Sequence, residues 1–349
     1  MLSAKIYFHN LNFILPSGTS RGILKNKPTW FIKIFKTNSP ETFGIGECGP
    51  IDGLSLDNVS EIPNKLKLIT ENINDLSKID LSLFPSIQFA LENAFKDLIN
   101  GGERIIFRNS FLKGFPIKIN GLIWMGSKEF MITQVKKKID EGFSCLKLKI
   151  GAINFDDEIK IIEKIRKQFS SEILEIRVDA NGAFNSKNIF DKLKQLDKFK
   201  IHSIEQPIGV SKWEEMREVC KYSPIPIVLD EELIHIKEKH QELLDYINPN
   251  YLVLKPTLLG GIKSTQKWIN TANDNNIKWW ITSALESNIG LNAISQLCAE
   301  YELELPQGLG TGQLFENNIV SPLTVNGEEI SYQKNIKWDL SIFKWNDRN

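Results

Sequence analysis

Strand-like runs recur about every 25 to 30 residues over the later two thirds of this 349-residue chain. Each run is followed by a stretch with helical character, except for a final extended piece near residues 304–309. Repeated β-α units of this length are what a closed parallel barrel requires. The pattern predicts an α/β fold, a modified (β/α)7β TIM-type barrel. The predicted strands lie at residues 116–124, 145–150, 173–179, 201–205, 226–230, 251–255 and 278–283.

The amino-terminal part follows a different pattern. Residues 5–15 and 29–35 read as strands rich in Ile, Phe and Trp, and a turn-like PSGTSRG segment separates them. Residues 84–100 then place apolar side chains at helical spacing. Strands grouped before helices predict an α+β domain. The predicted divisions are residues 1–115 for this domain, 116–320 for the barrel, and 321–349 for a segment that either returns to the first domain or covers the barrel.

Composition narrows the class of partner. Lys plus Arg and Asp plus Glu number 43 each, so no global charge attracts nucleic acid or an anionic membrane surface. No apolar run approaches the roughly 20 residues of a membrane span, and MLSAKIYFHN lacks the apolar core of a secretory signal. The four scattered cysteines form no Cys-x-x-Cys pair, which favours reduced thiols. We expect a cytoplasmic protein with a small-molecule partner and with no nucleic acid or membrane partner. Oligomeric state is not encoded in these patterns.

Five charged residues fall at the ends of successive predicted strands. They are Lys149 in KLKI, Asp179 in IRVDAN, Glu205 in SIEQP, Asp230 in IVLDEE and Lys255 in LVLKPT, at intervals of 30, 26, 25 and 25 residues. In a barrel all five would converge at the carboxyl-end mouth, where barrel enzymes keep their active sites. A doubly wound open sheet is the alternative, but no phosphate-binding fingerprint follows the first strand. The placement of the charges therefore favours the barrel.

These residue types allow a narrow range of chemistry. Three carboxylates without a nearby histidine or thiolate form an oxygen ligand set that suits Mg²⁺, with Mn²⁺ as a substitute. A lysine on each side could act as a general base or acid. Lys147 lies two residues before Lys149 on the same strand face, and a second ammonium there disfavours the charged form of Lys149. Mg²⁺ bound to a substrate carboxylate would stabilise an enediolate formed when the α-proton leaves.

This order of residues, behind an antiparallel amino-terminal domain, resembles the enolase superfamily in its muconate-lactonising subgroup. Within the subgroup, several stretches resemble the o-succinylbenzoate synthase family: TSRG, GIGECGP, NGLIWMG, SALESNIGLN and GLGTGQLF. The resemblance implies that the first domain caps the barrel. It also implies a Mg²⁺-dependent hydro-lyase of menaquinone biosynthesis. The reaction would be a syn elimination of water from 2-succinyl-6-hydroxy-2,4-cyclohexadiene-1-carboxylate, which aromatises the ring to 2-succinylbenzoate.

The resemblance also implies roles for individual positions. Lys149 would remove the α-proton and then, as an ammonium, help hydroxide leave as water. Lys255 would stabilise the anionic intermediate from the opposite face. Asp179, Glu205 and Asp230 would bind the metal, and Asn181 would support that set from behind.

Further positions would contact the substrate itself. These are Lys147, Arg177, Ser283, Gly310 and Thr311, the last three near the succinyl tail. Loops of the capping domain, at residues 19–22 and 49–54, would close over the substrate and exclude water.

Other functions share part of this pattern. An N-acylamino acid racemase or a dipeptide epimerase of the same superfamily would use the same two strand-end lysines. Family epimerases show Asp-x-Asp near the eighth strand, where this sequence has GLGTG. A metal-free aldolase-type barrel would use Lys255 to form a Schiff base, but three carboxylates would then lack a purpose. A binding protein without activity would hold uncompensated charges at the mouth.

Overall fold

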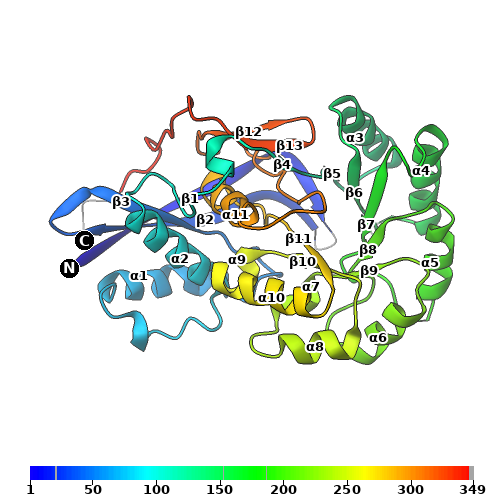
Figure 1. Ribbon diagram of the computed structural model, residues 1–349, viewed down its shortest axis with the longest axis horizontal. Helices are drawn as coiled ribbons and strands as arrows, with labels where there is room; N and C mark the ends of the chain where they lie inside the picture. The colour runs from blue at the N-terminus through cyan, green and yellow to red at the C-terminus, as the bar shows by residue number, and fades with distance from the viewer. Residues whose placement is uncertain (20–21, 152, 186, 346–349) are drawn as a thin grey trace.

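The computed structural model describes residues 1–19, 22–151, 153–185 and 187–345. A three-stranded antiparallel sheet with two helices lies at one end of the molecule (Figure 1). A parallel sheet wrapped by helices lies at the other end (Figure 1). The α+β domain and the α/β barrel predicted from the sequence are therefore both present.

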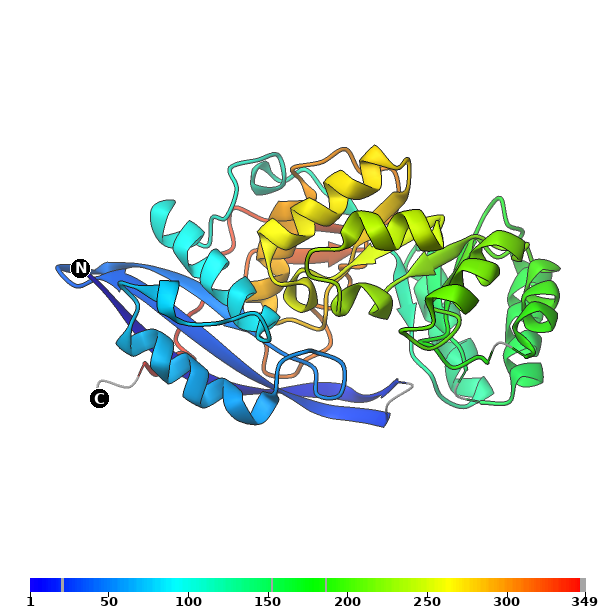
Figure 2. The same cartoon turned by 90° about the horizontal axis from the view of Figure 1, so that it is seen from below.

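The amino-terminal sheet has the strand order β1-β2-β3. β1 and β2 form a long hairpin that extends from this domain toward the barrel (Figure 2). The predicted loop at residues 19–22 is the tip of the hairpin, and its residues 20 and 21 lie outside the described residues. The strands are β1 (Leu2–Thr19), β2 (Gly22–Lys36) and β3 (Ser39–Cys48).

Two helices, α1 (Ile62–Glu71) and α2 (Pro85–Ile99), pack on this sheet through a common apolar core. α2 confirms the helix predicted over residues 84–100. It lies directly against β3, because Gly46 has no side chain: a Cβ there would come within 1.7 Å of the main-chain oxygen of Ala90. The GIG part of GIGECGP is thus a packing feature of the sheet.

The barrel sheet, within the described residues, has seven parallel strands in the order β11-β10-β9-β8-β7-β6-β5. Gln307 bridges to Ile119 and Gly308 bridges to Thr282, so this short segment fills the gap between β11 and β5. The extended piece predicted near residues 304–309 therefore closes the barrel. The strands are β5 (Gly121–Ile123), β6 (Cys145–Lys149), β7 (Glu175–Asp179), β8 (Ser203–Glu205), β9 (Ile227–Leu229), β10 (Tyr251–Leu254) and β11 (Lys278–Ile281).

Helices cover the outside of this sheet (Figure 1). On β6, Leu146 and Leu148 are buried in the large apolar core that also contains helix residues such as Ile161. Lys147 and Lys149 take the opposite, inward face of β6. The helices are α3 (Lys128–Asp140), α4 (Phe155–Gln168), α5 (Ile189–Asp197), α6 (Trp213–Tyr222), α7 (Glu231–Ile234), α8 (His240–Ile247), α9 (Pro256–Leu259), α10 (Ile262–Asp274) and α11 (Asn288–Cys298).

The run predicted as one strand over residues 116–124 is divided. β4 (Ile117–Lys118) pairs with β13 (Glu329–Tyr332) in a small antiparallel sheet, whereas β5 belongs to the barrel. β12 (Leu323–Asn326) completes that small sheet. The division arises because a segment more than two hundred residues away in the chain pairs with the first half of the run.

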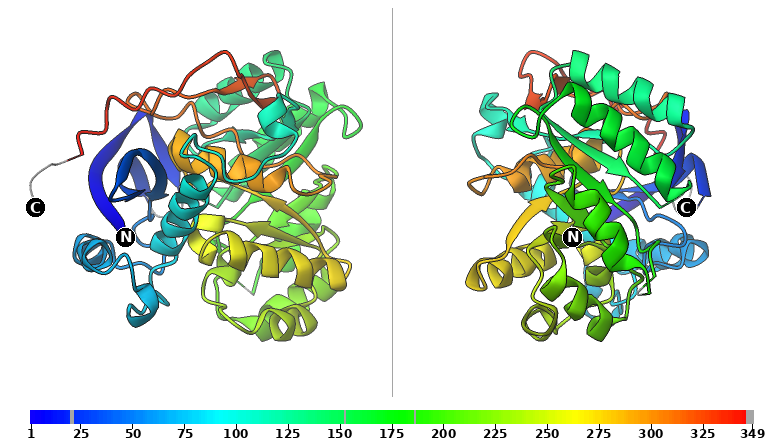
Figure 3. Two further views of the ribbon diagram at one scale, coloured as in Figure 1. Left: turned by 60° about the vertical axis from the view of Figure 1, so that its left-hand side comes forward. Right: turned by 90° about the vertical axis from the view of Figure 1, so that its right-hand side faces the viewer.

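After β13 the chain runs back to the amino-terminal sheet (Figure 3). Phe343 packs against Phe31 with ring centroids 4.8 Å apart and against Tyr7 at 5.5 Å. This aromatic contact joins the last described residues to the first domain. The domain divisions at residues 115 and 320 stay a prediction. Among the described residues, no helix has the length and apolar character needed to cross a membrane.

Candidate active site

The barrel brings the five predicted strand-end charges together. Lys149, Asp179 and Glu205 are the last residues of β6, β7 and β8, and they lie side by side in parallel register. Asp230 and Lys255 directly follow β9 and β10. Because the carboxyl ends of parallel strands meet at one end of a barrel, the five side chains surround a single space.

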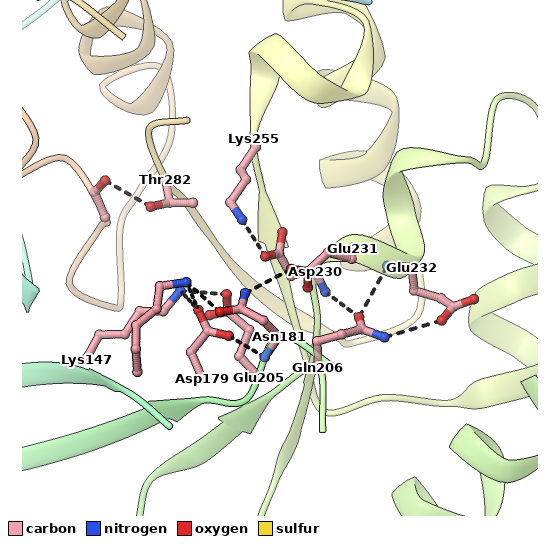
Figure 4. Close-up of polar contacts among 12 residues, drawn as sticks. Lys147, Asp179, Asn181, Glu205, Gln206, Asp230, Glu231, Glu232, Lys255 and Thr282 are labelled. Carbon is pink, nitrogen blue, oxygen red and sulfur yellow. Dashed lines mark hydrogen bonds and ion pairs between the residues drawn. The ribbon is translucent and has the colours of Figure 1, made fainter. Parts of the chain in front are cut away.

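Lysine ammonium groups contact all three carboxylates (Figure 4). The Nζ atom of Lys147 lies 2.9 Å from Oδ2 of Asp179 and 2.5 Å from Oε1 of Glu205. Lys255 donates to Asp230. The Nζ atom of Lys149 donates to the same Asp179 oxygen at 2.9 Å. Lys147 and Lys149 thus form one network with Asp179 and Glu205, and the pair of Lys255 and Asp230 lies beside it.

Burial and neighbouring charges together set the electrostatics of this network. Burial raises the pKa of Glu205, and the neighbouring carboxylates of Asp179 and Asp230 raise it further. Burial would also raise the pKa of Asp179, but the ammonium groups of Lys147 and Lys149 outweigh it and hold that pKa below its usual range. Burial would lower the pKa of Lys147, but the surrounding carboxylates outweigh it and raise that pKa. Lys147 therefore stays a cation.

As they are placed, the carboxylates face lysines and not one another. No group of three His, Cys, Asp or Glu side chains among the described residues is arranged to hold a metal ion. The donor set of Asp179, Glu205 and Asp230 is nevertheless all oxygen, buried and drawn from consecutive strands, which is the chemistry that Mg²⁺ prefers.

A cavity of about 1070 Å³, including its open mouth, lies above this network. Lys147, Lys149 and Lys255 line its floor. We call it the mouth cavity. Both domains contribute apolar wall residues, which are Ile23, Leu24, Ile51, Leu54, Trp124 and Leu285. The cavity thus offers three cations at one end and an apolar surface at the other, which suits an anionic, partly apolar small molecule.

Comparison with known proteins identifies the fold family. Residues 131–331 match the family model described as Enolase C-terminal domain-like. The chain is 44% identical over 354 residues to an o-succinylbenzoate synthase of Desulfotalea psychrophila, covering 91% of this chain and 95% of that protein. The chain belongs to the enolase superfamily. The resemblance drawn from the strand-end residues is thereby confirmed.

Two solved structures show the same enolase-superfamily architecture. The crystal structure of MenC from Desulfotalea psychrophila superposes with a TM-score of 0.85 at 40% identity, covering 95% of this chain and 99% of that one. The muconate lactonizing enzyme from Pseudomonas fluorescens superposes with a TM-score of 0.81 at 20% identity, covering 98% and 96%. At that lower identity the second likeness shows the fold alone, a TIM-type barrel with a capping domain.

The remaining predicted positions divide into two groups. Ser283, Gly310 and Thr311 line the mouth cavity, and so do Ile51, Asp52 and Leu54 of the predicted loop at residues 49–54. Asn181 also lines it and accepts a hydrogen bond of 2.8 Å from Lys149. Gly22 is the only described member of the predicted loop at residues 19–22 in the cavity wall.

Arg177 does not line the mouth cavity of this enolase-superfamily barrel. Its Nε donates to Glu175 at 2.7 Å, its Nη1 donates to the main-chain oxygen of Pro306 at 2.9 Å, and its guanidinium stacks over Trp280. The structure therefore does not bring Arg177 into the cavity wall, and its contact with substrate stays a prediction. Arg177 precedes Asp179 by two residues, which places its side chain about 6 to 7 Å further back along the strand. It shares the inward face of β7 with Asp179 but lies in a deeper layer of the barrel.

Sequence reasoning missed Glu231, which lines the mouth cavity and accepts a hydrogen bond of 2.9 Å from Asn181. The signal was present, because Glu231 directly follows Asp230 in VLDEE. It also missed that Trp124 lines the mouth cavity. The available signal was that this aromatic residue of NGLIWMG lies at the end of a predicted strand.

Proposed function

We propose that this protein is an o-succinylbenzoate synthase, a hydro-lyase of menaquinone biosynthesis in the cytoplasm. Its substrate would be 2-succinyl-6-hydroxy-2,4-cyclohexadiene-1-carboxylate and its product 2-succinylbenzoate. The observation that carries this proposal is the 44% identity to a synthase over nearly the whole chain, with the paired lysines in place. A dicarboxylate with an apolar ring matches a cavity that has a cationic floor and an apolar wall.

Lys149 is the proposed base. It lies at the end of β6 with its side chain 14% exposed, and it reaches the floor of the mouth cavity. In its neutral form its Nζ takes the α-proton, and the electrons move into the ring carboxylate to give an enediolate. The ammonium so formed returns that proton to the leaving hydroxide, which departs as water. One group serves both steps because a syn elimination removes both substituents from the same face.

Lys255 is the proposed electrostatic partner. It lines the same floor from β10, with three strands between it and Lys149. Burial would lower the pKa of Lys255, but the carboxylate of Asp230 outweighs it and raises that pKa. A lysine held as a cation stabilises the anionic intermediate by charge. The same contact argues against a Schiff base, which requires a neutral amine.

Asp179, Glu205 and Asp230 are the proposed ligands of Mg²⁺, which Mn²⁺ could replace. Support comes from their oxygen-only chemistry, their burial and their places on consecutive strands. When bound, the ion would supply a Lewis acid that stabilises negative charge on a substrate carboxylate. Asn181 supports this set by linking Lys149 to Glu231.

N-acylamino acid racemisation is the second candidate, because Lys149 and Lys255 both line the cavity and racemisation needs a base on each face. The wall at Gly310 and Thr311 offers no acid pair to grip the amino group of a dipeptide, which disfavours epimerase activity.

The deciding experiment supplies the cyclohexadiene substrate with Mg²⁺ and follows the ultraviolet absorbance of the aromatic product. N-succinylamino acid racemisation is measured beside it by polarimetry. We expect rapid aromatisation. No aromatic product together with fast racemisation would reverse the order of the two functions.

A further inference from the structure

A buried lysine of the capping domain has no part in the mechanism above. Lys27 lies on β2 and is only 4% exposed. Its Nζ donates a hydrogen bond of 2.9 Å to the main-chain oxygen of Leu285, a residue 258 positions later in the chain. Leu285 has a left-handed backbone, with φ of 64°, and lines the mouth cavity. We call residues 283–287 the mouth turn.

Two buried carboxylates attract this ammonium. Glu47, from β3, accepts from the main-chain N–H groups of Ser287 and Gly290, each at 2.8 Å, and so caps the start of α11. Glu286, in the mouth turn, is also fully buried, and both carboxylates attract Lys27. Gly49 leaves the space for this cation, since a Cβ there would lie 2.6 Å from Nζ of Lys27.

Glu286 fixes the direction of two hydroxyl groups in the cavity wall. A carboxylate can only accept, so Ser283 must donate its hydroxyl hydrogen to Glu286, at 2.5 Å. Thr311 in turn donates to the oxygen of Ser283 at 2.7 Å. Both hydrogens therefore point toward Glu286. Thr257 donates to the other oxygen of Glu286, so the carboxylate is held by hydroxyl groups on both sides.

We propose that Lys27 is a positioning residue of the active site, which holds the mouth turn in place through the main-chain oxygen of Leu285 so that Ser283 and Thr311 meet the substrate in one fixed arrangement. The identity of the substrate rests on the proposed function. The contact itself does not.

The cost of the arrangement supports a functional reason for it. Taking an ammonium out of water costs several kcal/mol, and partners repay it only when the geometry is good. Burial lowers the pKa of Lys27, and the carboxylates of Glu286 and Glu47 act against that lowering. If Lys27 served only to neutralise Glu47, any change that also removed the charge of Glu47 would be harmless. That alternative gives a different experimental outcome.

The first test is Lys27→Met, with Lys25→Met as the matched control on an exposed position of the same strand. We expect KM of the proposed substrate to rise at least about tenfold at neutral pH while kcat stays within about threefold, as expected when ground-state contacts are lost. Unchanged KM in folded Lys27→Met would overturn the proposal.

The second test is Lys27→Met combined with Glu47→Gln, which removes the ammonium together with one buried negative charge. We expect KM to stay raised, because the main-chain oxygen of Leu285 still lacks its hydrogen-bond donor. Recovery of wild-type KM would show that Lys27 only neutralises Glu47, and would overturn the proposal. If the single variant does not fold, this double variant carries the test.

Hydrogen–deuterium exchange of peptides from residues 283–290 gives a readout that needs no turnover. We expect faster exchange in Lys27→Met than in Lys25→Met, and equal rates would contradict the proposal. If the wild type forms no aromatic product, the proposed function fails, while the exchange result still decides whether Lys27 holds the mouth turn.

Discussion

The inward face of β7 carries ionic side chains at both ends of the barrel, and the two ends behave differently. Near the strand start, Arg177 is paired with Glu175, bonded to the main-chain oxygen of Pro306 and covered by Trp280. We call these residues, with His202, the floor cluster. The floor cluster lies deeper in the barrel than the mouth cavity and is separate from the three lysines that line the cavity floor. At the strand end, Asp179 shares one oxygen between two lysines, and carboxylates crowd beside it.

The difference lies in pairing and access, since both ends are charged. The floor cluster holds its cation with one anion, one carbonyl and one aromatic ring, away from the mouth cavity. The mouth gathers like charges that repel one another, and its lysines line a cavity. An ion pair enclosed by the barrel and away from a cavity holds structure, whereas crowded like charges at a cavity are the arrangement expected of a functional site.

The largest expected effect concerns the mouth. Lys149→Ala should lower the rate of aromatisation by about a thousandfold or more, because the proposed base is removed. The melting temperature should stay close to that of the wild type, since the side chain makes little core packing. Product absorbance and circular dichroism measure the two quantities. Retained turnover would contradict the assignment of the base.

Removal of divalent metal comes next. Treatment with a chelator should reduce aromatisation by about a hundredfold or more, and added Mg²⁺ should restore it. Asp179→Asn should raise the Mg²⁺ concentration needed for half-maximal rate, whereas Glu175→Gln, on the same face of β7, should not. A Mg²⁺ titration of initial rates checks both. If both variants raised the required Mg²⁺ concentration equally, the assignment of metal binding to the mouth alone would be contradicted.

Arg177→Met tests the floor by itself. The change leaves the half-buried Glu175 without its cationic donor, and we expect a loss of about 2 kcal/mol in the free energy of unfolding. The rate per folded molecule should stay within about threefold. Urea denaturation gives the first value and product absorbance the second. A selective loss of rate without loss of stability would support the prediction that Arg177 contacts the substrate.

The smallest effect is the response of the floor cluster to acid. Burial lowers the pKa of His202, while Glu175 acts against that lowering. The folded state therefore binds fewer protons at His202 than the unfolded state does, and stability falls as pH drops below about 6.5. His202→Gln should remove less than about 1 kcal/mol of this dependence. Urea midpoints between about pH 5 and pH 8 measure it, with exposed His235→Gln as the control.

Much of the fold follows from patterns within single segments. The helix over residues 84–100 and the barrel strands from 145 onward match their predicted places, because each has its own alternation or helical spacing. The five strand-end charges could be placed at one mouth for the same reason. Parallel strands in a barrel bring their carboxyl ends together whatever lies between them.

The features that the sequence did not indicate are contacts between distant segments and the depth of side chains in the barrel. Residues 116–124 divide because β13 captures their first half, and nothing within the run itself signals that pairing. Arg177 shares its strand face with Asp179, and alternation gives the face but not the depth. Lys27 reads from sequence as an ordinary strand lysine, although it contacts the mouth turn 258 positions away.

The sequence by itself determined the period of the barrel, the inward face of each strand and the set of charges at the strand ends. Only the tertiary structure decided which of the inward charges reach the cavity, which complete an ion pair below it, and which lysine of the capping domain meets the mouth turn. Periodicity specifies direction along one segment, whereas depth and partners depend on how separate segments pack together.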